Sequence, residues 1–215
     1  MKNIESILIG VSVAAIPLLS ALTLHEVAHG RVALLFGDRT AKAQGRLSLN
    51  PLKHIDPIGT VLLPIVLYAA GSPFLFGWAK PVPIDPRHFK HPRADMAWVA
   101  LAGPASNLVM ACLWTLIWRF GLSGLFGTGV AAAWLINMGR FGLVINVVLA
   151  VFNMLPVPPL DGGMIVGQLL PARWQAAYAS IGRYGFMIMM VLLFLRVPYY
   201  LFNPVFHFFR SVLLH

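Results

Sequence analysis

Residues 5–36 form a long apolar segment that contains the polar sequence HEVAH at positions 25–29. A helix needs about 20 apolar residues to cross a bilayer, and this segment is long enough. Ionisable side chains are costly inside a membrane and are usually functional there, so His25, Glu26 and His29 require an explanation. The segment therefore predicts a membrane helix that carries a chemical site.

The remainder of the chain is equally apolar. Of its 215 residues, 59% are hydrophobic and only 11% are charged, whereas a soluble domain is about half apolar and a quarter charged. Further apolar segments are found at residues 57–71, 94–120, 131–155, 174–197 and 198–215. We expect an all-α polytopic membrane protein with about five or six transmembrane or re-entrant helices.

Three features of this organisation are less regular. Residues 57–71 are short for a membrane span and contain Pro64, so they either span or re-enter on one side. The aromatic residues 198–215 either span or lie in the interface. Alternating residues near 40–50 predict a short membrane-associated strand. We expect a single domain over residues 1–215, with C-terminal helices from residue 172.

The basic residues predict the orientation of the chain, whose net charge is +9. Eight of them flank residues 57–71: Arg39, Lys42, Arg46, Lys53, Lys80, Arg87, Lys90 and Arg93. If residues 57–71 are re-entrant, all eight lie on one face, and the positive-inside rule makes that face cytoplasmic. No basic run has interleaved aromatic residues, so we expect no nucleic-acid partner.

HEVAH matches the H-E-x-x-H pattern, which is typical of metal-binding sites. Residues four apart share one face of a helix, so His25 and His29 can present their imidazoles to one metal ion. Glu26 then lies beside that ion, where it can accept a proton from water. Zinc suits nitrogen and oxygen ligands and lowers the pKa of water to about 7. The alternative is that these polar residues only join helices together.

A catalytic zinc ion needs a third protein ligand. No glutamate follows Glu26, so this ligand must be an aspartate or another histidine. Asp38 is close in sequence to the motif but is not excluded. The remaining candidates in loops have simpler explanations as caps, ion pairs or surface groups: Asp56, Asp85, Asp95, His54, His88, His91 and His207. Asp161 lies in PPLDGG between two apolar segments, and we predict that it is the third ligand. Its alternative is an ordinary Asp-Gly turn.

Three motifs together resemble a known family. HEVAH, GPASN at 103–107 and NMLPVPPLDG at 153–162 are similar to the three signatures of the site-2 proteases, which are intramembrane zinc metalloproteases of peptidase family M50. The resemblance covers residues 19–171. It is closest to the small prokaryotic members that have no PDZ or CBS domains.

The resemblance implies a zinc metalloendopeptidase with one Zn²⁺ per chain, held by His25, His29 and Asp161, with Glu26 as the catalytic base and acid. It implies Asn107 and Asn153 as oxyanion or substrate contacts. The alternatives are a helix-packing amide for Asn107 and a helix cap for Asn153.

The implied partners are a transmembrane protein substrate and the lipid bilayer. The implied location is the cell membrane, in a multi-pass chain whose active site lies towards the cytoplasm. Two rival functions remain at this stage. One is an inactive relative that binds transmembrane helices without cleaving them, and the other is a metal transporter that uses the same ligands as a transit site.

Overall fold

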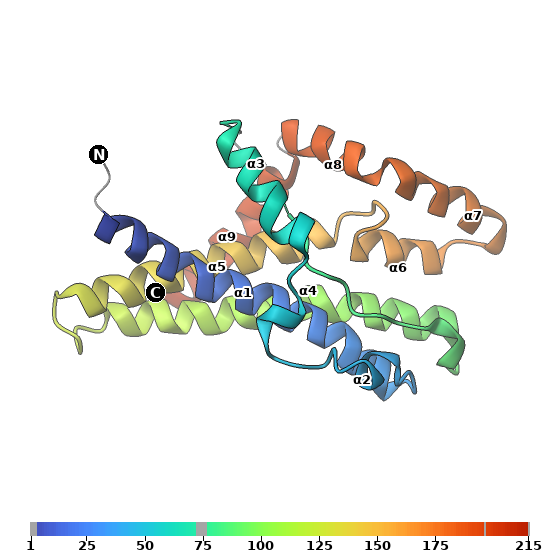
Figure 1. Cartoon of the computed structure of the whole chain (residues 1–215), viewed down its shortest axis with the longest axis horizontal. Helices are drawn as coiled ribbons and strands as arrows, with labels where there is room; N and C mark the ends of the chain where they lie inside the picture. Colours follow the sequence, from blue (N-terminus) through green and yellow to red (C-terminus); the bar gives the residue numbers. More distant parts are fainter. Residues whose placement is uncertain (1–3, 72–76, 196, 215) are drawn as a thin grey trace.

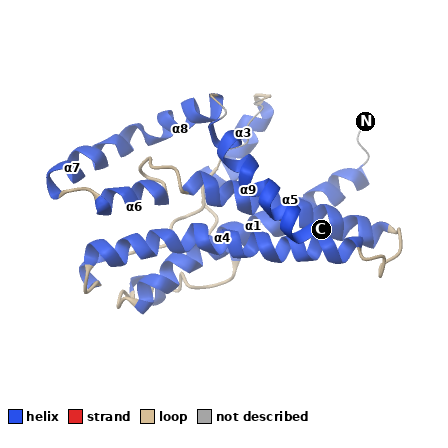
Figure 2. Cartoon of the chain, turned by 180° about the vertical axis from the view of Figure 1, so that it is seen from behind, coloured by secondary structure: helices blue, strands red, loops and turns tan. Residues whose placement is uncertain are grey.

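The computed structural model describes residues 4–71, 77–195 and 197–214, and the regular structure in these ranges is helical, with no strand (Figures 1 and 2). Within these described ranges, three helices are long and apolar enough to cross a membrane. They are α1 (Ile4–Leu35), α4 (Pro92–Leu122) and α5 (Val130–Asn153). The chain is therefore an all-α membrane protein, as its composition predicts.

Helices α4 and α5 are joined by a glycine-rich turn and pack together along their lengths, and α1 lies against both (Figure 1). Glycines allow the close approach of α4 and α5. A Cβ at Gly139 would overlap the backbone of Trp118, and one at Gly142 would overlap the Trp114 ring. Small residues are common at helix contacts in membranes because dispersion contacts there replace the hydrophobic effect.

A hydrophobic cluster fixes the C-terminal helix to this bundle. Ala111 of α4, Leu143 and Val147 of α5, and Phe209 of α9 (Val197–Leu214) are all buried in it. The segment predicted at residues 198–215 is thus helical and lies against α5 and α4. Whether α9 crosses the membrane remains a prediction.

The connection from α1 to α4 contains short helices: α2 (Thr40–Ala43), the 3₁₀ helices η1 (Pro51–Lys53) and η3 (Pro86–His88), the π-helical η2 (Pro57–Leu62) and α3 (Leu63–Ala69). The strand predicted near residues 40–50 is wrong for this part of the described chain. A strand needs a partner backbone, and this segment instead makes helical turns and side-chain bonds. The Arg46 guanidinium donates to the carbonyls of Lys80 and Pro81, and Asn50 caps η1.

Asp38 joins the end of α1 to the segment before α4. Its carboxylate accepts hydrogen bonds from the Thr40 N–H and hydroxyl, from the Asp85 N–H and from His88 Nδ1. Burial alone would raise the pKa of Asp38, but these donors together hold it below the usual value. The side chain is fully shielded from solvent, so this carboxylate is a structural junction.

The chain after α5 folds back over the bundle. An irregular, proline-rich segment at 154–160 leads into α6 (Asp161–Leu169), which packs on α4, and α7 (Ala172–Ile181) and α8 (Gly185–Phe194) follow. The segment predicted at 174–197 is thus interrupted by a 3₁₀ turn, Gly182–Tyr184. The Arg93 guanidinium of α4 donates to the carbonyls of Gln168 and Leu170 and so fixes the C-terminal end of α6.

Candidate metal centre

His25 and His29 lie one turn apart on the face of α1 that packs on α4. Both residues are buried, at 8% and 7% exposure. The two rings meet edge to face, and their Nε2 atoms are 3.0 Å apart. The helical spacing of the motif therefore brings two imidazole nitrogens to one point, as predicted.

Asp161 reaches the same point from the first turn of α6. Its Oδ2 lies 3.2 Å from His25 Nε2, and its Oδ1 lies 3.4 Å from His29 Nε2. One ligand atom from each of the three residues falls within 4.8 Å of the others. Gly162 and Gly163 permit this position, because a Cβ on either would overlap the backbone of residues 154–158. The proline-rich segment thus returns the chain towards α1.

The hydrogen bonds at the outer nitrogens determine what these three residues can hold. His29 Nδ1 lies 2.7 Å from the Val99 carbonyl oxygen, which can only accept, so this nitrogen donates. His25 Nδ1 lies 2.6 Å from Asn107 Oδ1. In neutral rings with protonated Nδ1, both Nε2 atoms carry lone pairs. These lone pairs face each other and a carboxylate whose buried Oδ2 receives no hydrogen bond.

Three converging lone pairs without a proton between them repel one another unless a cation lies among them. Two imidazole nitrogens and a carboxylate oxygen are the donors that zinc takes in catalytic sites with three protein ligands. Imidazole ligands commonly donate their other N–H to a carbonyl or carboxylate, which fixes the tautomer. The residues present therefore fit a zinc ion.

Helix α4 forms the wall behind both imidazoles. Val99, Gly103 and Asn107 are spaced four apart, so they share one face of the helix. The Val99 carbonyl holds His29, the Asn107 amide holds His25, and Gly103 leaves room for both rings. The GPASN motif thus begins and ends on residues that contact the two histidines.

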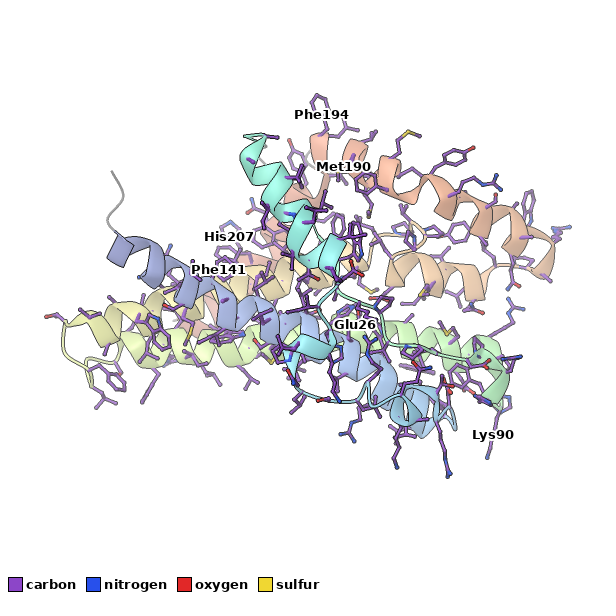
Figure 3. All side chains as sticks on the ribbon, viewed as in Figure 1. Glu26, Lys90, Phe141, Met190, Phe194 and His207 are labelled. Carbon is purple, nitrogen blue, oxygen red and sulfur yellow. The ribbon has the colours of Figure 1, made fainter. Side chains whose placement is uncertain are left out.

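Glu26 lies beside the cluster but is not part of it. Its half-buried carboxylate accepts a hydrogen bond of 2.8 Å from the Val82 N–H, in the extended segment that crosses α1 (Figure 3). Arg46 and the His54 carbonyl bind the backbone of the same segment at Lys80 and Pro81. A carboxylate that lies next to the three candidate ligands but is bound to a different partner suits a proton carrier better than a ligand.

Sequence comparisons identify the family of the chain. The model of peptidase family M50 matches residues 120–196, which include Asp161. "Putative zinc metalloprotease YwhC" of Bacillus subtilis (strain 168) is 40% identical over 193 residues, which cover 88% of this chain and 84% of that protein. The chain belongs to peptidase family M50.

Further relatives of this M50 chain come from mycobacteria. The protein named Rip2 in Mycolicibacterium smegmatis is 34% identical over 175 residues, covering 81% of this chain and 64% of that protein. The Rip2 protein of Mycobacterium tuberculosis is 30% identical over 193 residues, covering 86% of this chain and 71% of that protein. Both have the same description as YwhC. No solved structure matches the chain.

The two predicted asparagines lie in different surroundings in this M50 chain. Asn107 is fully buried, and its amide is used by His25, Asn146 and the Ala21 carbonyl. This geometry favours the packing alternative left open above, with an added role in holding His25. Asn153 is in the last turn of α5, where its Nδ2 donates to the Leu149 carbonyl. Its contact with substrate remains a prediction.

The other candidate ligands lie outside the cluster. Asp56 caps η2, Asp85 caps η3, and Asp95 accepts from the His91 N–H, in line with the simpler explanations. The bonds from Arg87 bring the pKa of Asp85 to about 2. Asp38 is held in its junction at the end of α1.

Sequence reasoning missed three contributors to this site: Asn146, Gly103 and the Val82 N–H. Asn146 had a usable signal, because it is a polar residue deep in the apolar helix 131–155. Gly103 was visible within GPASN, but its contact with the imidazoles was not. A backbone N–H such as that of Val82 leaves no trace in a sequence.

Proposed function

We propose that this chain is an intramembrane zinc metalloprotease that hydrolyses peptide bonds within or near transmembrane segments of other membrane proteins. Membership of a peptidase family whose relatives are named zinc metalloproteases supports the protease chemistry. The observation that carries the proposal is the convergence of His25, His29 and Asp161 beside Glu26.

In this proposal His25, His29 and Asp161 hold one zinc ion per chain. When bound there, zinc would polarise the scissile carbonyl and lower the pKa of a water molecule. Glu26 accepts the proton from the attacking water and then returns it to the leaving amine. The Val82 N–H orients the Glu26 carboxylate for both transfers.

The position of the motif in α1 supports hydrolysis inside the membrane. The candidate span runs from Gly10 to Leu35, and at 1.5 Å per residue His25 lies about 22 Å from its start and about 15 Å from its end. The site thus lies within the span and nearer to the end that leads into the basic loops. Water can reach such depth only where protein lines its path.

The same basic loops supply the proposed orientation. Arg39 and Lys42 follow α1, and Arg87 and Lys90 precede α4, so the ends of two candidate spans carry positive charge. The positive-inside rule then places this end, and the site near it, towards the cytoplasm. In this orientation the partners are the lipid bilayer of the cell membrane and a transmembrane substrate.

The test combines metal content with cleavage. Purified chain is reconstituted in liposomes with a library of single-span transmembrane peptides, and products are identified by mass spectrometry. We expect Glu26→Gln to keep its zinc and lose cleavage, because it changes the base and leaves the ligands. His25→Ala and Asp161→Ala lose zinc and cleavage, whereas Lys90→Ala, an exposed change far from the cluster, keeps both.

Three results would contradict the proposal. Equal cleavage by wild type and Glu26→Gln would show that Glu26 is not the catalytic base. A zinc-loaded wild type that cleaves none of the library would favour a non-catalytic binding protein, and zinc flux across the same liposomes would favour a transporter. Full zinc retention by Asp161→Ala would refute the third ligand.

A further inference from the structure

Consecutive hydrogen bonds lead from His25 into α5. His25 Nδ1 lies 2.6 Å from Asn107 Oδ1, and Asn107 Nδ2 donates to Asn146 Oδ1 over 3.0 Å. Asn146 Nδ2 in turn donates to the Gly142 carbonyl over 2.8 Å. Both asparagines are 0% exposed, so bulk water cannot replace a missing partner.

Backbone carbonyls fix the direction of every bond in this series. The Gly142 carbonyl can only accept, so Asn146 must turn its NH₂ group towards it and its Oδ1 towards Asn107. The Asn107 NH₂ group then donates to Asn146 and to the Ala21 carbonyl, 3.3 Å away. Asn107 Oδ1 is left facing His25, whose Nδ1 must donate.

We propose that Asn146 is a positioning residue of the metal centre, although it touches none of the three ligands. It holds the Asn107 amide in the one orientation that protonates His25 at Nδ1 and leaves Nε2 free for the metal. This inference rests on the proposed zinc function and adds a residue on a third helix to it.

A comparison of the two histidines explains why His25 needs this support. The acceptor for His29 is the Val99 carbonyl, which belongs to the backbone of α4 and cannot turn over. The acceptor for His25 is a side-chain amide, which a rotation of 180° would convert into a donor. Asn146 Oδ1, at 3.0 Å, and the Ala21 carbonyl, at 3.3 Å, both accept from the Asn107 NH₂ group and so oppose this rotation, and the shorter bond is the one to Asn146. Bonds aligned in one direction also polarise one another, which strengthens the series.

The test uses zinc affinity, measured in detergent by competition with a chelator, together with thermal unfolding of the zinc-free protein. Asn146→Leu keeps a similar volume but removes both polar groups. Asn146→Asp keeps the acceptor for Asn107, and in its protonated form it also keeps the donor for Gly142. Thr115→Val is the matched control, because Thr115 is equally buried on α4 and its hydroxyl donates to the Ala111 carbonyl in its own helix.

We expect Asn146→Leu to weaken zinc binding about 10- to 100-fold, the usual effect of losing a residue that orients a ligand. Asn146→Asp and Thr115→Val should bind zinc as the wild type does. If Asn146 only packed the helices together, Asn146→Leu would unfold at a lower temperature than the wild type but would bind zinc with the same affinity.

The outcomes separate this inference from the function on which it rests. A wild type that binds no zinc overturns the proposed function. A wild type that binds zinc together with a folded Asn146→Leu of equal affinity overturns the role of Asn146 alone. If Asn146→Leu does not fold, Asn146→Ala, which also removes both polar groups and adds no volume, decides: a loss of affinity of tenfold or more relative to Thr115→Val, about 1.4 kcal/mol, supports the role, and affinity near that of Thr115→Val refutes it.

Discussion

Gly103 of α4 lies directly against the His29 imidazole of α1, so that a Cβ at position 103 would overlap Nε2 of His29. The same Cβ would come within 2.6 Å of Cε1 of His25. Nε2 of His29 and Cε1 of His25 are therefore packed against bare backbone. Glycine is the only residue that lets α4 support both rings at this distance.

Gly103→Ala should weaken zinc binding by at least about 100-fold, because the added methyl group displaces both imidazoles. Alanine is a better helix former than glycine by about 1 kcal/mol, so a weaker α4 cannot explain the loss. Gly10→Ala is the control, since a Cβ at Gly10 meets nothing within 4 Å. Zinc affinity measured by chelator competition checks both, and wild-type affinity in Gly103→Ala would contradict the packing argument.

Val82→Pro removes a single N–H, the one that donates to Glu26. The flanking residues Pro81 and Pro83 already hold this segment in an extended form. We expect kcat to fall about tenfold, equivalent to 1.4 kcal/mol, with zinc content unchanged. Val82→Ala retains the N–H and should keep its kcat. Steady-state cleavage of a transmembrane peptide measures both, and an unchanged kcat in Val82→Pro would show that Glu26 needs no such partner.

Asp38→Asn should destabilise the protein at pH 7 by about 1–3 kcal/mol, because it removes the charge that accepts from Thr40, Asp85 and His88. Folding lowers the pKa of Asp38, so its ionised form contributes stability above the unfolded-state value of about 4. That contribution is lost as the pH falls through the lower pKa of the folded state. Unfolding in detergent between pH 7 and pH 2 should therefore bring wild type and Asp38→Asn together, and a gap that widens towards low pH would be the opposite of our expectation.

Arg93→Ala should loosen the C-terminal end of α6, because the guanidinium holds the carbonyls of Gln168 and Leu170. Asp161 begins the same short helix, so we expect zinc affinity to fall severalfold and amide hydrogen exchange in α6 to rise. Lys90→Ala removes an exposed cation three residues earlier, just before α4, and should change neither (Figure 3). Unaltered hydrogen exchange in α6 would mean that its other contacts with α4 are enough to hold it in place without Arg93.

Local periodicity was enough to predict that the His25 and His29 side chains meet at one point. The spacing of His25 and His29 depends only on helical geometry. Asp161 was predicted because the chain offers no later glutamate and because this aspartate lies between two apolar segments. The strand near residues 40–50 failed because alternation reports a possible strand and not the presence of a partner backbone. The roles of Gly103 and Asn146 depend on how α1, α4 and α5 pack, and a residue pattern carries no such distances.

The position of Asp161 on a short helix after a proline-rich segment has a topological consequence. A metal ion held by His25 and Asp161 would join α1 to the segment that follows α5. It would close a long loop of chain, and a cross-link of that kind stabilises a fold by restricting the unfolded state, as a disulfide does. Cys112 is the only cysteine, so no disulfide within the chain can serve this purpose. The coordination bonds of the ion would then cross-link α1 to α6, far apart in the sequence, in place of a disulfide.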